Sequence, residues 1–192
     1  MDVVELRARL RRAPPADAVY GDDGTEGRDA ASTPAAVLIP LIVHKELTVL
    51  FTQRTVHLKN HSGQVSFPGG RAEPGDASAE FTALRETEEE IGLAMQRVEV
   101  LARLPDYRTR TGFRVTPVIG LVAPPLELAP DPREVAEVFE VPLAFLMDER
   151  NRQRRTREFQ GQQVGYYVFE YGERVIWGAT AGILVNLNRM LA

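Results

Sequence analysis

The sequence lacks cysteine and has no long apolar run. Without cysteine among its 192 residues, the chain cannot form a disulfide, a thiolate metal site or a cysteine nucleophile. No apolar run approaches the ~20 residues that a membrane-spanning helix needs. The charged N-terminus, MDVVELRARLRRAPPADA, has no apolar centre of the kind found in signal peptides. We therefore expect a cytoplasmic protein that has no membrane partner.

The sequence also lacks an excess of basic residues. It has 23 lysines and arginines against 27 acidic residues, which gives a formal net charge of −4. A general nucleic-acid-binding protein normally presents a basic face, so we expect no nucleic-acid partner. A small phosphate-rich substrate stays compatible with this charge, because a few arginines or a metal ion can receive it. Hydrophobic residues make up 44% and charged residues 26%, as in a globular protein with one sizeable core.

Hydrophobic patterning predicts strands and helices that are mixed rather than regularly alternating. We expect helices over 3–12, 77–92 and 179–192, and a helical turn within 131–148. We expect strands over 35–44, 47–54, 98–104 and 113–123, one within 131–148, and two or three within 157–178. This order favours an α+β fold or an α/β/α sandwich over a doubly wound sheet. We divide the chain into an N-terminal helix with an irregular segment, 1–34, and a single domain, 35–192.

The helix expected over 77–92 gathers acidic side chains into one stripe. From Glu86, Glu89 lies about 60° to one side and Glu90 about 40° to the other. Like charges at these spacings destabilise an isolated helix, and Arg85 can neutralise only Glu89 at the i, i+4 spacing. Hard divalent cations such as Mg²⁺ or Mn²⁺ take such oxygen ligands. A solvated acidic face is the alternative, and the spacing alone leaves both interpretations open.

The segment VSFPGG, 65–70, precedes this helix and strengthens the metal interpretation. Pro68 and the two glycines stand where the chain leaves a strand and turns toward the helix. Glycine lets the backbone come close to a metal or a phosphate, where a side chain would obstruct it. A pair of glycines followed about fifteen residues later by R-E-x-x-E-E-x-G is much stronger evidence than the glycines alone.

The segment GGRAEPGDASAEFTALRETEEEIGL, 69–93, resembles the Nudix box. The pattern of that box is G-x5-E-x7-R-E-U-x-E-E-x-G-U, where U is a bulky aliphatic residue. The residues that fit it in order are Arg85, Glu86, Glu89, Glu90, Gly92 and Leu93. There are two departures from the pattern. Asp76 stands where the first glutamate belongs, with one extra residue before Arg85, and Thr87 occupies an aliphatic position.

The segment LFTQRTVHLKNHSGQVSFPGG, 50–70, is similar to the signature of the coenzyme A pyrophosphatase branch of Nudix hydrolases. That signature is L-L-T-x-R-[SA]-x3-R-x3-G-x3-F-P-G-G. The matching residues are Thr52, Arg54, Gly63, Phe67, Pro68, Gly69 and Gly70. Phe51 and Thr55 differ from the pattern, and Lys59 replaces its second arginine. Lysine keeps the positive charge but loses the two-pronged geometry that suits phosphate.

This resemblance implies a fold, an activity and a set of site residues. The implied fold is the Nudix-type α/β/α sandwich around a mixed β-sheet. The implied activity is metal-dependent cleavage of the pyrophosphate of coenzyme A, or of its derivatives, to 3′,5′-ADP and 4′-phosphopantetheine. The implied ligands of Mg²⁺ or Mn²⁺ are Glu86, Glu90, Glu89 and the carbonyl of Gly70. The implied substrate-binding residues are Arg54, Lys59, Phe67 and Gly69.

Catalytic roles are expected for Glu89, for Arg85 as the residue that orients a glutamate, and for a general base outside the box. The segment DPREVAEVFEVPL, 131–143, offers Glu134 and Glu137 as bases, and we prefer Glu134 because it adjoins the Pro-marked loop. The alternative is that both simply face solvent. A Nudix hydrolase of ADP-ribose, a dinucleoside polyphosphate or NADH is the rival enzyme. A Nudix-fold sensor that does not cleave its nucleotide is the rival class, although such proteins usually lose glutamates from the box.

Overall fold

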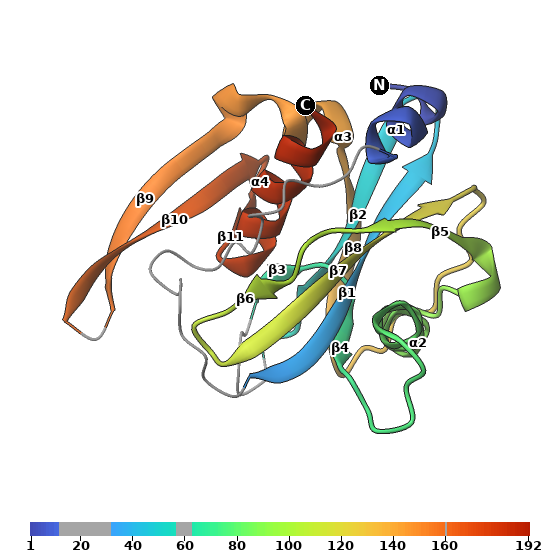
Figure 1. Ribbon diagram of the computed structural model, residues 1–192, viewed down its shortest axis with the longest axis horizontal. Helices are drawn as coiled ribbons and strands as arrows, with labels where there is room; N and C mark the ends of the chain where they lie inside the picture. Colours follow the sequence, from blue (N-terminus) through green and yellow to red (C-terminus); the bar gives the residue numbers. More distant parts are fainter. Residues whose placement is uncertain (12–31, 57–62, 160) are drawn as a thin grey trace.

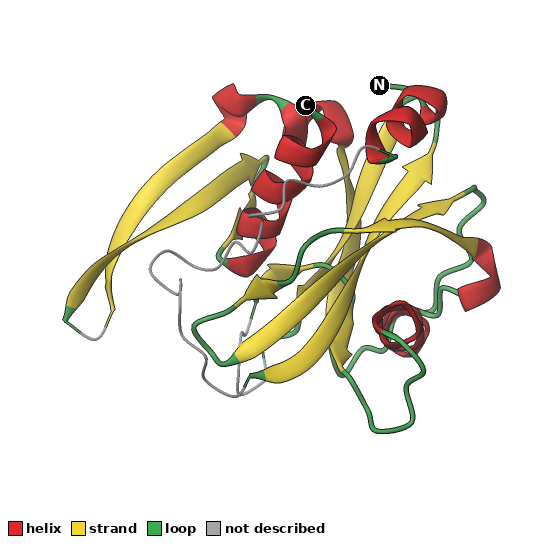
Figure 2. Ribbon diagram, viewed as in Figure 1, coloured by secondary structure: helices red, strands yellow, loops and turns green. Residues whose placement is uncertain are grey.

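The computed structural model of the protein describes residues 1–11, 32–56, 63–159 and 161–192. Its centre is a mixed sheet whose strands are β1 (Thr33–Val43), β2 (Leu47–Arg54), β3 (Val65–Ser66), β4 (Gly69–Arg71), β5 (Val98–Arg103), β6 (Tyr107–Arg108), β7 (Phe113–Val122) and β8 (Val135–Pro142). The strand order is β3-β2-β1-β7-β5, with β8 on β2, β4 on β1 and β6 on β7. Figures 1 and 2 show this sheet running through the middle of the molecule.

Strand β1 lies at the centre of this sheet and explains why the sheet is mixed. It pairs antiparallel with β2 as a hairpin, in which Leu41 faces Val49, and parallel with β7 along ten residue pairs. Because helices cover both faces, β1 reads in the sequence as a continuous apolar run rather than as an alternating one. The hairpin predicted from 35–44 and 47–54 is confirmed.

Helices lie on both faces of the central sheet. They are α1 (Val3–Leu10), α2 (Ala79–Ile91), α3 (Leu143–Met147) and α4 (Ala179–Leu191), with short 3₁₀ turns η1 (Met95–Arg97) and η2 (Glu149–Asn151). Helix α2 covers one face, and α4, with α1 beside it, covers the other (Figure 1). Leu38 of β1 joins the core under α2, whereas its neighbour Ile39 joins the core on the α4 side. The predicted α+β class and α/β/α sandwich around a mixed sheet are confirmed.

A second sheet of three antiparallel strands lies beyond α4 (Figure 1). Its strands are β9 (Arg152–Phe159), β10 (Gln162–Tyr171) and β11 (Arg174–Trp177). For this second sheet, the sequence predicted strands only from residue 157 onward, because the arginine-rich start of β9 has no apolar pattern. Stacking compensates for that lack: the guanidinium carbons of Arg152 and Arg154 each lie 5.8 Å from the ring centre of Tyr167.

Two other boundaries differ from the predictions. Helix α2 covers Ala79–Ile91 rather than 77–92, because the Ser78 hydroxyl accepts a hydrogen bond from the Phe81 amide at 3.2 Å and so caps the helix. Gly92, with φ of 71°, ends it as predicted. The segment between the strands expected over 98–104 and 113–123 contains the short strand β6, which pairs with β7.

The N-terminal helix packs onto the rest of the fold. Leu6 of α1 is fully buried in the same core as α4. The division of the chain at residue 34 stays a prediction. Within the described ranges, no helix is both long and apolar enough to cross a membrane.

Candidate functional site

The inner face of α2 fixes the orientation of the acidic stripe. Ala83, Thr87 and Ile91 are buried against the sheet. The Thr87 hydroxyl donates a hydrogen bond to the carbonyl of Ala83 at 2.6 Å. This bond within the helix lets a polar side chain be buried at an aliphatic position of the Nudix box. With this face fixed, Glu86 and Glu90 project from the helix toward β4.

The two glycines of β4 lie directly against these carboxylates. A Cβ on Gly70 would stand 2.3 Å from the Glu86 Oε2 atom, so the strand approaches Glu86 more closely than any side chain would permit. The Gly69 amide donates a hydrogen bond to the Glu90 Oε2 atom at 3.2 Å. Gly69 has φ of 149°, and a Cβ there would lie 2.4 Å from the Ala36 carbonyl oxygen. A side chain at Gly69 would therefore collide with the backbone of β1, whereas a side chain at Gly70 would displace the Glu86 carboxylate.

Glu90 is a buried acidic residue of the site, with 8% of its surface exposed. Burial is the main cause that raises the pKa of Glu90 to about 7, and the negative charges of Glu134 and Glu86 contribute to this rise. The Gly69 amide and Arg54 act in the opposite direction but do not offset the burial. The Arg54 Nη1 atom lies 3.8 Å from Glu90 Oε1, which is a loose ion pair.

Glu86 has a raised pKa for the same reasons. Burial is the main cause, and the charges of Glu89 and Glu134 add to it, whereas the contact with Arg85 at 3.0 Å lowers it. Two partly or largely buried carboxylates thus share a site, and the arginine beside each one does not offset the effect of burial on its negative charge.

A divalent cation fits this arrangement. Among the described residues, no three acidic or histidine side chains form a complete metal cluster by themselves. Magnesium, however, is usually held by one or two carboxylates together with water and substrate phosphates. Glu86 and Glu90, with the backbone of β4 beside them, match that kind of site.

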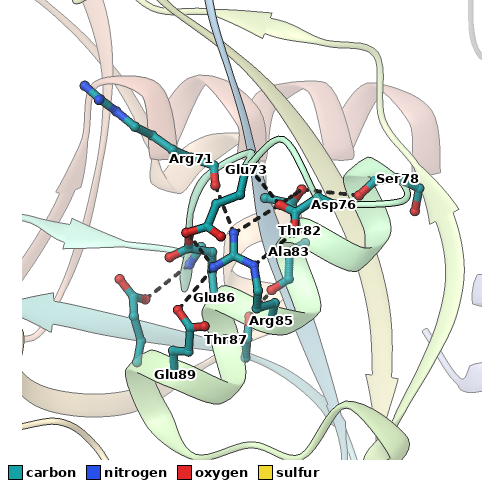
Figure 3. Close-up of polar contacts among 12 residues, drawn as sticks. Arg71, Glu73, Asp76, Ser78, Thr82, Ala83, Arg85, Glu86, Thr87 and Glu89 are labelled. Atoms are coloured by element: carbon teal, nitrogen blue, oxygen red, sulfur yellow. Dashed lines mark hydrogen bonds and ion pairs between the residues drawn. The ribbon is translucent and has the colours of Figure 1, made fainter.

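Arg85 links the acidic residues of the site (Figure 3). It donates to both carboxylate oxygens of Asp76, from Nε at 3.1 Å and from Nη2 at 3.0 Å. Its Nη1 donates to Glu89 Oε2 at 3.1 Å, and its Nη2 also donates to the Arg71 carbonyl at 3.1 Å. The expected i, i+4 pair with Glu89 is therefore present. The structure adds a two-pronged pair with Asp76 and a bond to β4, which together hold Arg85 in place.

Asp76 is the residue whose part in the site the sequence did not reveal. The hydrogen bonds from Arg85 and then from the Glu73 amide lower the pKa of Asp76 well below its usual value. The Thr82 hydroxyl also donates to it, at 2.8 Å. The available signal was the place of Asp76 in the Nudix box, where an acid is expected. In this structure that acid is the partner of Arg85.

The predicted substrate-binding residues separate into different environments. Arg54 lies beside Glu90, and its buried Nε finds no hydrogen-bond acceptor among the described residues. Phe67 is 3% exposed and stacks on Phe51, with ring centres 5.1 Å apart. This position contradicts a direct contact between Phe67 and a substrate, because the ring is part of the core. Lys59 lies outside the described residues.

The two candidate bases also differ. Glu134 is exposed, and its charge contributes, after burial, to the raised pKa of both Glu86 and Glu90, which places it within electrostatic range of them. Glu137, on β8, forms an ion pair with Arg174 of β11. Of the two, Glu134 is the one whose charge acts on Glu86 and Glu90, and its role as a general base stays a prediction.

Comparison with known proteins agrees with this geometry. Residues 32–160 match the family model described as the NUDIX domain. The chain is 43% identical over 157 residues to an uncharacterized Nudix hydrolase, NudL, of Photorhabdus laumondii, covering 82% of this chain and 84% of that protein. It is 40% identical over 153 residues to the NudL of Escherichia coli strain K12, covering 80% of each chain.

The fold comparison gives the same answer. The crystal structure of the Nudix hydrolase RenU from M. smegmatis superposes with a TM-score of 0.50 at 25% identity, covering 59% of this chain and 72% of that one. The mixed sheet and the acidic helix that follows the glycines of β4 thus define a Nudix-type hydrolase fold. The chain belongs to the NUDIX domain family. Nudix hydrolases generally use divalent metal ions and act on small-molecule nucleotide substrates.

Proposed function

We propose that the protein hydrolyses the pyrophosphate of coenzyme A, or of its derivatives, to 3′,5′-ADP and 4′-phosphopantetheine, with Mg²⁺ or Mn²⁺ as cofactor. One observation carries the proposal: Glu86 and Glu90 are held together against β4, and burial raises the pKa of both although an arginine lies beside each. The upstream segment 50–70, which resembles the coenzyme A pyrophosphatase signature, supports the choice of substrate.

The residues of the site would have different roles in this reaction. Glu86 and Glu90 would hold the ion, with Glu89 and the Gly70 backbone beside them. When bound, a divalent ion neutralises pyrophosphate charge and activates water for attack on phosphorus. Arg85 positions Glu86 and Glu89 and does not contact the substrate. Glu134 would accept a proton from the attacking water as general base.

Arg54 is the proposed partner of the pyrophosphate. A buried N–H group that lacks an acceptor costs free energy. Within the described part of the chain, the Arg54 Nε is such a group, and it lies next to the carboxylate pair. A phosphate oxygen would satisfy it and would share the charge-assisted geometry that arginine forms with phosphates. The position of Arg54 therefore favours the binding of a phosphorylated ligand at this end of β2.

A substrate assay with matched variants tests the proposal. Coenzyme A and ADP-ribose are each incubated with the protein and Mg²⁺ or Mn²⁺, and the products are identified by mass spectrometry. We expect 3′,5′-ADP and 4′-phosphopantetheine from coenzyme A, and a loss of kcat by orders of magnitude in Glu86→Gln and Glu90→Gln. Glu88→Gln is the control, because Glu88 points about 200° away from Glu86 on the same helix.

Two results would contradict the proposal in different ways. Brisk cleavage of ADP-ribose without cleavage of coenzyme A would reject the substrate but keep the hydrolase. Near-normal kcat in both Glu86→Gln and Glu90→Gln would reject the proposed role of the carboxylate pair.

A further inference from the structure

Arg71 ends β4, one residue after the glycine that lies against Glu86. Its backbone carbonyl accepts the hydrogen bond from Arg85, so the backbone of Arg71 is part of the site. Its side chain is exposed and leads away from the carboxylates, as Figure 3 shows. Because successive side chains of a strand point to opposite faces, Gly70 faces α2 and Arg71 faces the other side.

The Arg71 guanidinium is held on an aromatic ring. Its central carbon lies 5.2 Å from the ring centre of Phe113, at the start of β7, across strand β1. A cation over an aromatic face is attracted to it and loses part of its freedom. In the described part of the chain, no carboxylate forms an ion pair with Arg71. The result is a positioned positive charge with its hydrogen-bonding groups available, close to an acidic site.

The charge distribution of the proposed substrate gives this arginine a use. Coenzyme A carries a phosphate monoester in addition to the pyrophosphate that is cleaved. The monoester does not react, and the carboxylates of Glu86, Glu89 and Glu90 would repel it. It therefore needs a cation outside the carboxylate cluster. Arg71 meets this need, because it follows the glycine that lies against Glu86 and its side chain leads away from the carboxylates.

We infer that Arg71, stacked on Phe113, binds the non-reacting phosphate monoester of the substrate and thereby selects substrates that carry it. The inference rests on the proposed function and adds a specificity-determining residue to it. The guanidinium offers two parallel N–H groups to a phosphate, a geometry that lysine cannot reproduce. Arg71 acts on affinity for one group of the substrate and takes no part in bond cleavage.

The test compares coenzyme A with dephospho-coenzyme A, which lacks only the 3′-phosphate. We expect the wild-type protein to prefer coenzyme A in kcat/KM by about 10- to 100-fold, the range for a hydrogen bond to a charged group. Arg71→Ala should remove this preference, because it should raise KM for coenzyme A much more than it changes kcat or the kinetics with dephospho-coenzyme A. Arg71→Lys should keep part of the preference. Arg150→Ala is the control, since Arg150 is an exposed arginine that pairs with Asp148 away from the site.

A binding measurement separates this inference from the proposed function. Calorimetric titration with 3′,5′-ADP and with 5′-AMP reports the same phosphate without any turnover. Tighter binding of 3′,5′-ADP that is lost in Arg71→Ala would support the inference even if coenzyme A were not cleaved. An unchanged preference in Arg71→Ala, or an equal loss for both substrates, would overturn it while leaving the hydrolase intact. Thermal unfolding of each variant verifies that it is folded.

Discussion

Replacing Glu90 by glutamine should inactivate the enzyme and at the same time stabilise its metal-free form. Burial raises the pKa of Glu90 from 4.5 to about 7. The folded state therefore holds this proton more tightly than the unfolded state. The stability that the folded state gains from binding a proton at Glu90 is fully present below pH 4.5 and is lost as the pH rises through 7. A rise of this size corresponds to about 3 kcal/mol of unfolding free energy.

Glutamine removes the buried charge but keeps an oxygen that can accept the Gly69 amide bond. Without metal, Glu90→Gln should therefore be more stable than wild type at pH 8 by up to about 3 kcal/mol, and nearly equal to it at pH 4. For a chain of this size the gain corresponds to a rise of about 6–12 °C in Tm.

The assay is urea unfolding in the presence of a chelator at pH 4, 6 and 8. The difference between wild type and variant removes the contribution of titrating groups that do not interact with Glu90. Glu88→Gln is measured in parallel and should show no such pH-dependent gain. A Glu90→Gln protein that is equally stable or less stable than wild type at pH 8 would refute the reasoning from burial.

Three further predictions concern the neighbours of the carboxylates. Asp76→Ala removes the two-pronged partner of Arg85, so kcat/KM should fall about 10- to 100-fold, as for other residues that orient metal ligands, and steady-state kinetics will measure it. Gly70→Ala should abolish activity at little cost in stability, because the new Cβ meets only the movable carboxylate of Glu86. Gly69→Ala, which meets the backbone at Ala36, should instead lower Tm strongly. Phe67→Ala should cost about 3–5 kcal/mol in urea unfolding, as a buried aromatic does, and leave KM for substrate unchanged.

The sequence predicted most of the fold because its local patterns and its tertiary packing agree. The apolar run of β1 and the capped helix α2 each carry a strong periodic or terminal signal. The second sheet was not predicted as a separate layer. Strand β9 begins with arginines that are stabilised by stacking on Tyr167 of the neighbouring strand, and such contacts across strands leave no local pattern.

For the candidate site, the sequence likewise predicted some of the residues that lie together but not all of them. Motif spacing identified the carboxylates and the glycines, which the structure brings together at α2 and β4. The same motif made Phe67 a substrate contact, although the structure buries it. Spacing records that a residue type is required but does not record whether its side chain faces the core or the ligand. The roles of Asp76 and Arg71 depend on contacts with Arg85 and Phe113 that only the folded chain makes.

Binding of Mn²⁺ by wild type, Glu86→Gln, Glu90→Gln and Glu88→Gln, followed by electron paramagnetic resonance at pH 8, tests the central claim most directly. We expect that wild type and Glu88→Gln bind the ion and that Glu86→Gln and Glu90→Gln lose this binding. Equal Mn²⁺ binding in all four proteins, or none in wild type, would contradict the claim that this carboxylate pair is a metal site.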